Sequence, residues 1–558
     1  MATAAPRSDH ATHAVVNQSQ PLADYNVFSS DRALVEAVAR EGGDFAVDTV
    51  REVGALAGRA ETIELGRLAN ENEPVLRSHD RHGNRIDEVE YHPSWHELMS
   101  MHVSHGLHAL PWRRPEPGAQ VARAAAFMCL SQAEAGTGCP VSMTFSAVPA
   151  LRVQPELAAE WEPRLTALNY DPRAVPAAGK AGVLCGMAMT EKQGGSDVRA
   201  NTTAATPLNG GGPGAEYEIT GHKWFCSAPM CDAFLVLAQA EGGISCFLLP
   251  RFTPDGERNR FHIQRLKDKL GNRSNASGEV EFDTAWARLV GDEGRGVATI
   301  IEMVNHTRLD CTTGSAACIR AGAAQAIRHC RQRSAFGRPL VEQPLMQNVL
   351  ADLAIESEAT TTAAMWLARQ FDEAHAGDER AQLVRRIATP VLKYWTCKRA
   401  PMHAAEALEC FGGNGYVEDS GMPRLYREAP VSSVWEGSGN VQALDVLRAM
   451  VKSPEATDAF ADEIGAAAGA EPRLDRFGAA LAADLRDASD VEFRARGLVE
   501  RMAVAMQASL LVRYGDPAVA DAFCASRLDG EHGEAFGTLP AGVAATAPTI
   551  IERATPAT

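Results

Sequence analysis

The sequence predicts an α+β protein that is mainly helical, with a β-rich segment between two helical regions. Three observations lead to this prediction. Residues 30–175 and 295–400 carry apolar residues at helical spacing. Residues 186–290 contain short runs rich in β-branched and aromatic residues, separated by Gly, Asn and Asp, which is typical of an antiparallel sheet or barrel. A further Ala-rich helical unit follows Pro454, and the 558 residues are enough for three or four domains.

The helical segments have recognisable ends and faces. ALVEAVAREGG ends on paired glycines, a usual stop signal for a helix. In VQALDVLRAMV we expect Val441, Leu444, Leu447 and Val451 to form one buried face, with Ser438 or Asn440 as the N-cap. LDRFGAALAADL and VEFRARGLVERMAVAMQASLLV carry the apolar stripes of the last unit.

Composition excludes several classes of protein. Apolar residues make up 45% and charged residues 22%, as in ordinary globular proteins, and the net charge of −17 disfavours general attraction to nucleic acid or anionic membranes. No run of 18 apolar residues predicts a membrane span, and the first twenty residues lack the apolar core of a secretory signal. The 12 cysteines show no CxxC pairing, so we expect reduced, mostly buried thiols and a cytoplasmic protein.

Two short segments have the residues for holding a ligand. In MTEKQGGSD, 189–197, paired glycines permit close backbone approach, and a serine with nearby amides can hold phosphate oxygens; an ordinary turn is the alternative. In GHKWFCS, 221–227, the aromatics can form a wall along a flat ring, or they can pack in the core.

Basic and histidine-rich segments are less specific. RSAFGRPL, 333–340, ends an arginine-rich helix, which suits phosphate oxygens but equally satisfies the helix dipole. The histidines from His102 to His108 have no carboxylate or thiolate companion at metal-ligand spacing, so we predict no metal site. The sequence also contains no Walker loop, no GxSxG elbow and no Rossmann fingerprint.

The segment VWEGSGN, 434–440, places one carboxylate, Glu436, between an indole and a Gly-Ser-Gly turn. A solvated surface glutamate needs neither neighbour. The alternative is that Glu436 caps the helix that follows.

The order of these segments is more specific than any one of them. With DKLGNRSNAS, PRLYRE and FGGNGY, they resemble the acyl-CoA dehydrogenase family from about residue 185 to 445. The individual residues within these motifs resemble the AidB-type adaptive-response branch of that family, and this resemblance extends over nearly the whole chain. The resemblance implies an N-terminal helical domain (1–185), a β-barrel domain (186–290), a four-helix domain (291–452) and an added C-terminal helical domain (453–558). It also implies bound FAD and a homotetramer.

The resemblance assigns roles to individual residues. Glu436 matches the catalytic base, which removes the α-proton of an acyl thioester, and Arg308 matches a position near the thioester cleft. The residues implied to bind FAD are Met189, Thr190, Gly195, Ser196, Phe225, Cys226, Ser227, Trp435, Ser438 and Asn440, with Arg333, Phe336, Gly412 and Gly413 reaching the FAD of a neighbouring subunit. Trp-Glu-Gly-Ser replaces the usual Tyr-Glu-Gly-Thr around the base, so we expect a narrower acyl channel and poor turnover of ordinary acyl-CoA substrates.

Three functions remain open from the sequence. The first is a flavoprotein of the DNA-alkylation response that binds double-stranded DNA, inactivates alkylating compounds and has residual acyl-CoA dehydrogenase activity. The second is a metabolic dehydrogenase of short or branched acyl-CoA, and the third is a structural DNA-associated protein. The residues specific to the AidB-type branch favour the first function, in the DNA-alkylation response.

DNA binding conflicts with the charge of the last unit. Residues 456–558 contain nine Arg, no Lys and sixteen Asp or Glu, although a DNA-binding surface needs clustered positive charge. A partial basic stripe on one helix is predicted from four arginines: Arg494, Arg496, Arg501 and Arg513.

Overall fold

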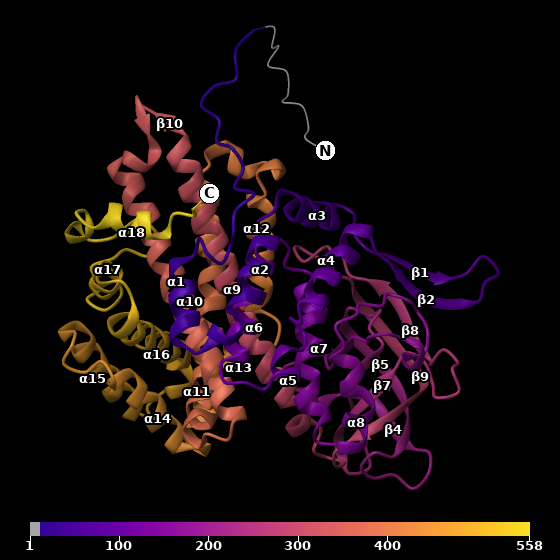
Figure 1. The fold of residues 1–558 in the computed structure, drawn as a ribbon. Helices are drawn as coiled ribbons and strands as arrows, with labels where there is room; N and C mark the ends of the chain where they lie inside the picture. The colour runs from indigo at the N-terminus through magenta and orange to yellow at the C-terminus, as the bar shows by residue number, and fades with distance from the viewer. Residues whose placement is uncertain (1–11, 558) are drawn as a thin grey trace.

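The structure is a computed structural model that describes residues 12–557, so most of the N-terminal segment used for the signal-peptide expectation lies outside the described residues. The first part of the chain is helical, as predicted (Figure 1). Its helices are α1 (Arg32–Arg40), α2 (Val47–Ala57), α3 (Ala60–Glu71), α4 (Pro93–Ser104), α5 (Leu110–Arg113), α6 (Ala119–Ser131), α7 (Gly138–Leu151) and α8 (Pro155–Leu165).

A β-hairpin that the sequence analysis did not predict interrupts these helices. Strands β1 (Val75–His79) and β2 (Arg85–Glu90) pair antiparallel and project from the body of the molecule (Figure 1). The Asp80 carboxylate accepts hydrogen bonds from the main-chain N–H groups of His82 and Asn84, and Gly83 adopts a positive φ of 86°. This turn chemistry, in the segment DRHGN, was the signal in the sequence for a hairpin.

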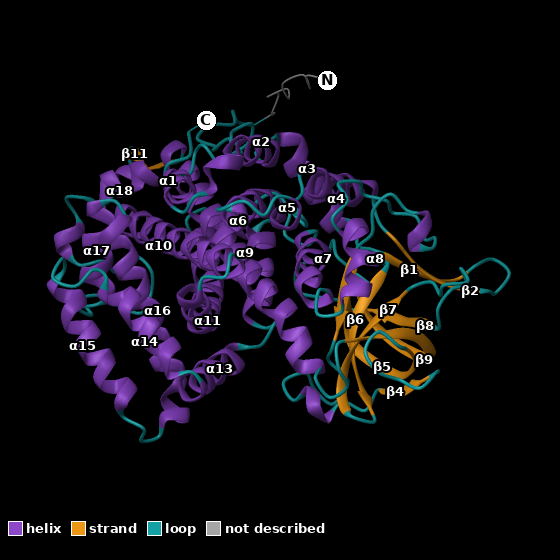
Figure 2. Ribbon diagram, turned by 60° about the horizontal axis from the view of Figure 1, so that its bottom comes forward, coloured by secondary structure: helices purple, strands orange, loops and turns teal. Residues whose placement is uncertain are grey.

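The β-rich segment forms a closed sheet, which confirms the predicted barrel. Its strands are β3 (Cys185–Ala188), β4 (Ala204–Pro207), β5 (Glu216–Ser227), β6 (Ala233–Ala240), β7 (Gly243–Pro250), β8 (Phe261–Leu266) and β9 (Ser277–Val290). The strand order is β3-β6-β4-β5-β9-β7, β8 pairs with β9, and β7 also pairs with β6, which closes the ring. Figure 2 shows α7 and α8 beside this barrel, between it and the long helices.

Long helices form the other half of the molecule. They are α9 (Gly296–Gln332), α10 (Pro344–His375), α11 (Glu379–Glu409), α12 (Met422–Glu428) and α13 (Gly439–Lys452), with the small hairpin β10 (Ser334–Ala335) and β11 (Arg338–Pro339) between α9 and α10. Alanines are frequent on the buried faces of α9, α10 and α11, which lets the helices pack closely.

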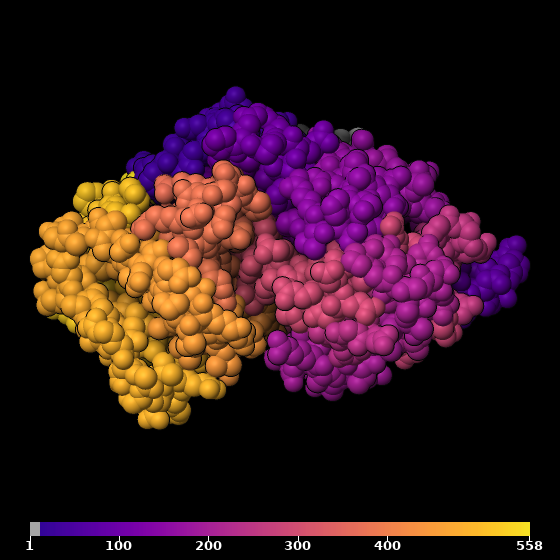
Figure 3. Space-filling model, turned by 90° about the horizontal axis from the view of Figure 1, so that it is seen from below, coloured from indigo at the N-terminus to yellow at the C-terminus, as the bar shows by residue number. Residues whose placement is uncertain are grey.

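The last part of the chain packs on α10 and α11 on the side away from the barrel (Figures 2 and 3). Its helices are α14 (Pro454–Gly465), α15 (Pro472–Arg486), α16 (Val491–Tyr514), α17 (Pro517–Arg527) and α18 (Ala547–Ala554). Arg553 of α18 forms ion pairs with Glu36 of α1 and with Glu358 of α10, so the two ends of the chain meet. The added unit is therefore tied to the rest of the molecule.

The predicted buried face of α13 was wrong. Val451 is 82% exposed and Leu444 is 38% exposed. The helix instead buries Gln442, Ala443 and Val446, together with other small or polar residues. The reason is local: polar groups of this face support the turn that precedes α13, as described below. Ser438 is the N-cap position, as predicted, but its side chain makes no capping hydrogen bond.

The cysteine prediction is confirmed, since eleven of the twelve thiols are buried and Cys318 is half-buried. Within residues 12–557, no helix is both long enough and apolar enough to span a bilayer.

Candidate functional site

The turn that carries Glu436 has an unusual backbone. It lies between a short 3₁₀ segment, Ala429–Ser433, and the start of α13. Glu436 has a φ of 57°, in the left-handed region that non-glycine residues seldom adopt, and Gly437 follows with a φ of 93°. Such a conformation costs about 1–3 kcal/mol and persists only where its surroundings impose it.

Buried polar side chains impose that conformation by binding the carbonyl groups of the turn. Lys393 of α11 donates from Nζ to the carbonyl oxygens of Trp435 at 2.8 Å and of Gly437 at 2.6 Å. The carbonyl oxygen of Glu436 accepts from Arg308 Nε at 3.1 Å and from Gln442 Nε2 at 2.9 Å. All three donors are at most 5% exposed. The turn is therefore held from the inside of the protein.

Arg308 is itself neutralised. Its Nη1 lies 2.8 Å from Asp445 Oδ2, and Arg386 contacts the other oxygen of that carboxylate at 2.8 Å. Charges in a dry interior need such partners. In the structure, Arg308 thus holds the backbone of Glu436; its predicted contact with substrate stays a prediction.

The Glu436 carboxylate accepts a hydrogen bond from the hydroxyl of Thr307, with 2.7 Å between Oγ1 and Oε2. Burial raises the pKa of Glu436, while Thr307, Arg308 and Lys393 oppose that shift. A carboxylate with a raised pKa is a stronger base than a solvated one. The local arrangement is that of a proton acceptor held in one position.

A second part of the site forms where the loop after β3 meets β5. Lys223 of β5 and Glu191 of the loop form a fully buried ion pair at 2.8 Å. Burial lowers the pKa of Lys223 to about 8, against the opposing effect of Glu191. The main-chain N–H of Trp224 donates to the carbonyl oxygen of Thr190 at 2.8 Å. The two segments that the sequence analysis singled out separately, 189–197 and 221–227, are therefore side by side.

A bulge in β5 turns aromatic residues outward. The pairing with β9 shifts between Lys223 and Cys226, as in a β-bulge, and Phe225 is 50% exposed while Trp224 is half-buried. Cys226 is fully buried, and burial raises the pKa of its thiol. The side chain of Cys226 is thus buried among the barrel residues, whereas Phe225 and Ser227 are more accessible; the expected flavin contacts of all three stay a prediction.

Cys139 of α7 links the two parts of the site. Its buried thiol is hydrogen-bonded to Ser227 and lies within electrostatic range of Glu436. Burial raises the pKa of Cys139 to about 12, with a further contribution from the Glu436 carboxylate. The structure therefore brings the β5 segment and the glutamate turn to the same α7 terminus.

The residues present fit a flat aromatic cofactor with a phosphate chain. Trp435 is half-buried, and its indole Nε1 is buried without a hydrogen-bond partner. Met189 and Thr190 are half-buried, whereas Gly195 and Ser196 are exposed on the same loop. Gly194 has a φ of 144° with open space around it, and Gly195 abuts the Thr190 side chain so closely that no Cβ fits. Ser438 and Asn440 are exposed beside the glutamate turn.

The remaining predicted FAD residues lie elsewhere in this chain. Arg333 follows the end of α9, whereas Thr307 lies near its start, and 26 helical residues correspond to roughly 40 Å. Phe336 is 97% exposed at the β10–β11 turn, and Gly412 and Gly413 are exposed near the end of α11. Arg333 donates to the carbonyl oxygen of Asn17. One chain does not bring this group to Glu436.

The four arginines predicted to bind DNA are occupied by protein partners. Arg501 forms an ion pair with Asp484, and Arg494 lies 3.4 Å from Asp487. Arg513 lies 3.7 Å from Glu463, and Arg496 donates to the Tyr394 hydroxyl at 3.2 Å. All are on α16, as predicted, but acidic side chains surround most of them.

The histidine-rich segment has a structural role. His102 and His108 are buried, their pKa values are lowered by burial to about 3 and about 4, and they bond to Thr137 and to the carbonyl oxygen of Ala167. No group of three or more potential metal ligands occurs among residues 12–557.

The sequence did not predict the residues that hold the Glu436 turn by hydrogen bonds to its backbone carbonyl groups. Thr307 precedes Arg308 in the segment HTRLD, which the sequence analysis had already selected. Its hydrogen bond to Glu436 could not be predicted from that segment. Nothing in the local sequence marks Lys393 or Cys139, because each lies on a helix far from Glu436 in the chain, and Gln442 is only six residues away but its role as a donor to the turn was not predicted.

A barrel between two helical regions, with a held carboxylate beside a flavin-type wall, defines an FAD-dependent oxidoreductase of the acyl-CoA dehydrogenase type. Comparison with family models agrees with this class. Residues 17–172 match the adaptive response protein AidB N-terminal domain, 186–285 the middle domain of acyl-CoA dehydrogenase and 294–451 its C-terminal domain. The chain belongs to the acyl-CoA dehydrogenase family and carries the AidB-type N-terminal domain.

Individual relatives are similar over most of the chain. AidB of Escherichia coli (strain K12) is 45% identical over 94% of this chain and 95% of that protein. Acyl-CoA dehydrogenase family member 11 of Caenorhabditis elegans is 34% identical over 70% of this chain and 64% of that protein. The crystal structure of Caenorhabditis elegans ACDH-11 in complex with C11-CoA has a TM-score of 0.84 and 27% identity, covering 94% of this chain and 95% of that one.

Proposed function

We propose that this protein removes hydrogen from the α and β carbons of an acyl-CoA thioester, with Glu436 as the base. The observation that carries the proposal is the Glu436 carboxylate itself. It is bound to Thr307 at 2.7 Å, has a pKa raised by burial, and stands on a backbone turn held by three buried donors.

The chemistry needs a base and a hydride acceptor. The α-proton of a thioester is weakly acidic, so its removal requires a carboxylate that is already dehydrated and in place. Glu436 takes the α-proton as the α–β bond becomes double, and FAD, held by the loop after β3 and by β5, would supply the acceptor for the β-hydride. We propose that the half-buried Trp435 indole, next to Glu436 in the chain, helps to exclude water from the carboxylate; burial raises the pKa of Glu436.

A crystallised relative supports the substrate class. The ACDH-11 structure was determined in complex with C11-CoA, and its fold covers 94% of this chain. We therefore propose an acyl-CoA as substrate here. Trp435 is larger than the tyrosine expected at its position, so turnover of ordinary acyl-CoA substrates is expected to be slow.

Replacement of the base tests the proposal. Glu436→Gln is nearly isosteric but accepts no proton, so we expect FAD content to be unchanged and acyl-CoA reduction of the flavin to fall by at least about 10²-fold. Flavin bleaching under anaerobic conditions with a panel of acyl-CoA thioesters measures this. Glu455→Gln, an exposed change at the start of α14, is the control. Equal bleaching rates for Glu436→Gln and the unaltered protein would remove Glu436 as the base.

A second proposed function is a role in the response to DNA alkylation through binding of double-stranded DNA, together with inactivation of alkylating compounds. The match of residues 17–172 to an adaptive-response domain and the 45% identity to AidB favour it. The pairing of the α16 arginines with acids weakens their assignment as the contact surface, because paired charges release fewer counterions on binding.

Titration with duplex DNA at increasing salt tests this second function. If α16 is the surface, Arg494, Arg496 and Arg501 changed together to Ala should weaken binding and flatten its salt dependence. The Glu455→Gln protein should bind as the unaltered chain does. Absence of binding at low salt would contradict the DNA role and leave the thioester proposal intact; unchanged binding by the triple variant would move the contact surface away from α16.

We further propose a homotetramer. The exposed apolar side chains Phe336, Leu345 and Tyr416, 97%, 85% and 84% exposed, support contact with another subunit at the end of the molecule that carries Arg333.

A further inference from the structure

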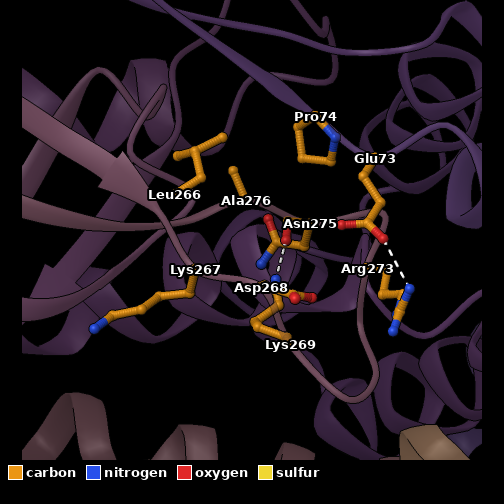
Figure 4. Close-up of a pocket in the computed structure, with 9 residues that line it drawn as sticks. All are labelled: Glu73, Pro74, Leu266, Lys267, Asp268, Lys269, Arg273, Asn275 and Ala276. Atoms are coloured by element: carbon orange, nitrogen blue, oxygen red, sulfur yellow. Dashed lines mark hydrogen bonds and ion pairs between the residues drawn. The ribbon is translucent and has the colours of Figure 1, made fainter.

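A separate pocket of about 220 Å³ lies beside the barrel. It is formed by the connection between α3 and β1, which contributes Glu73 and Pro74, and by residues 266–276 between β8 and β9 (Figure 4). Its volume is below the range of about 300–1,000 Å³ that holds drug-sized ligands, so its occupant is a small molecule or a small group.

The cations of this pocket are unequally paired. Lys267 lies 2.7 Å from Glu279, and Arg273 lies 3.0 Å from Glu73. Lys269 has no carboxylate at ion-pair distance within the described part of the chain, and its ammonium donates to the main-chain carbonyl oxygen of Asn275. Burial lowers the pKa of Lys269, which shows that its charge is poorly solvated. Glu428, Glu73 and Glu134 act on this ammonium only from beyond ion-pair distance, so a partly dehydrated cation without a contacting counterion is left to attract an anion.

Two further atoms of the pocket lack partners. Asn275 is 2% exposed, and its Oδ1 is buried without a hydrogen-bond donor. The Nε of Arg273 is also buried and unpartnered. Figure 4 shows the two pairs that cross the pocket, Lys269 with Asn275 and Arg273 with Glu73. An occupant that offers an anionic oxygen and a hydroxyl or N–H satisfies all of these groups.

The walls of the pocket are fixed before any ligand arrives. The Glu428 carboxylate accepts from the main-chain N–H of Asn272 at 2.8 Å, and Glu134 accepts from Ser274 Oγ at 2.7 Å. Gly271 packs so tightly on the carbonyl oxygen of Arg427 that a Cβ would lie 2.2 Å from it. A preformed site loses little conformational entropy when it binds.

We propose that this pocket binds a small acid, whose carboxylate or phosphate group contacts Lys269 and whose hydroxyl or N–H donates to Asn275. The site is distinct from the base: no residue that holds the Glu436 turn lines it. It is nevertheless close to the flavin wall, because Ala276 precedes Ser277, which pairs with Ser227. The same chemistry is offered by a free hydroxy acid and by a phosphate of coenzyme A.

Calorimetric titration of the FAD-loaded full-length protein with glycolate and with inorganic phosphate tests the site. We expect saturable binding of at least one probe, weakened by about tenfold or more in Lys269→Gln, because a charge-assisted hydrogen bond is lost. Lys269→Arg retains the charge and should retain binding. Lys452→Gln, an exposed lysine at the end of α13, should bind as the unaltered protein does.

A substitution of Glu73, at the surface edge of the pocket, is expected to strengthen anion binding instead of weakening it. Glu73→Gln removes the acid that pairs with Arg273 and should tighten anion binding several-fold, and it lies at the surface, where folding is little affected. Repeating the titration with coenzyme A present separates the sources: competition assigns the anion to the coenzyme, and independence assigns it to a free acid. No saturable binding of either probe, or equal affinities in Lys269→Gln, Glu73→Gln and the unaltered protein, would overturn the proposal.

Discussion

At the scale of single residues, Glu436 shows how a strained backbone and a chemical role occur together. Its left-handed φ of 57° directs the side chain toward Thr307, while its own carbonyl oxygen is bound by Arg308 and Gln442. Released from these donors, a glutamate would return to an ordinary conformation, because the αL region is unfavourable for residues with a Cβ. The position of the carboxylate is therefore a property of its neighbours.

Thr307→Val tests the positioning role of the hydroxyl. The hydrogen bond stabilises the charged form of Glu436, so its loss should raise the pKa of the carboxyl group further. Because the base works deprotonated, the rising limb of the pH–rate profile for flavin reduction should move to higher pH. Thr307→Ser should leave it in place. A profile that does not move in Thr307→Val would show that the hydroxyl does not set the pKa of the base.

At the scale of elements, the loop between β8 and β9 is fixed by the end of α12. Glu428 accepts hydrogen bonds from Asn272 and lies near Glu134 and Arg424. Burial and the nearby Glu134 raise the pKa of Glu428 to about 7. The motifs DKLGNRSNAS and PRLYRE, separate in the sequence, are therefore one structural unit.

Glu428→Gln should change how stability depends on pH. The pKa of Glu428 in the folded state is raised to about 7. The protonated carboxyl therefore stabilises the folded protein fully below its ordinary pKa of 4.5, and this stabilisation is lost as the pH rises from there through about 7. The Gln variant cannot ionise there. Between pH 5 and pH 8 its unfolding free energy should rise relative to the unaltered protein by on the order of 2 kcal/mol.

Denaturant unfolding at a series of pH values measures this difference. The comparison is confined to pH 5–8; Lys269 also faces this cluster, and burial lowers the pKa of its ammonium. Glu455→Gln provides the control for the loss of one surface carboxylate. A constant difference between Glu428→Gln and the unaltered protein across the range would exclude a raised pKa for Glu428.

At the scale of the whole molecule, the predicted FAD contacts divide between two distant places. Thr190, Phe225, Ser227 and Trp435 belong to the barrel side, while Arg333 lies roughly 40 Å along α9 from Thr307. If both groups of residues contact FAD, the protein must be an oligomer. The group around Arg333 of one subunit then completes the FAD site formed by the barrel residues of a second subunit.

Arg333→Ala tests this division. A guanidinium that binds phosphate oxygens of FAD in a neighbouring subunit contributes charge-assisted hydrogen bonds, so the variant should retain FAD about tenfold more weakly while the monomer remains folded. Arg331→Ala, which removes a surface ion pair between the end of α9 and Glu552 of α18, is the control. FAD content after dialysis and the oligomeric state by light scattering are the measurements. Equal FAD retention in both variants would exclude Arg333 from the cofactor site.

The sequence by itself determined the class of the fold and the family, and it singled out the residues that we propose for the chemistry. Apolar periodicity separates helical from β segments because each structure buries one face at a fixed repeat, and the ordered motifs identified the glutamate and the flavin loops before any contact was known. Even the unpredicted β1–β2 hairpin had a local signal in its Asp-Gly-Asn turn.

Only the tertiary structure decided how those residues are held and which faces they present. Lys393 and Cys139 act on the glutamate turn or Ser227 from distant parts of the chain, and Gln442 folds back from the next helix onto the carbonyl oxygen of Glu436. The bulge in β5 buries Cys226 and exposes Phe225, and support for the glutamate turn displaced the expected apolar face of α13. The physical reason is common to all of these cases: a buried hydrogen-bonding group must find its partner in space, and periodicity along the chain contains no information about that partner.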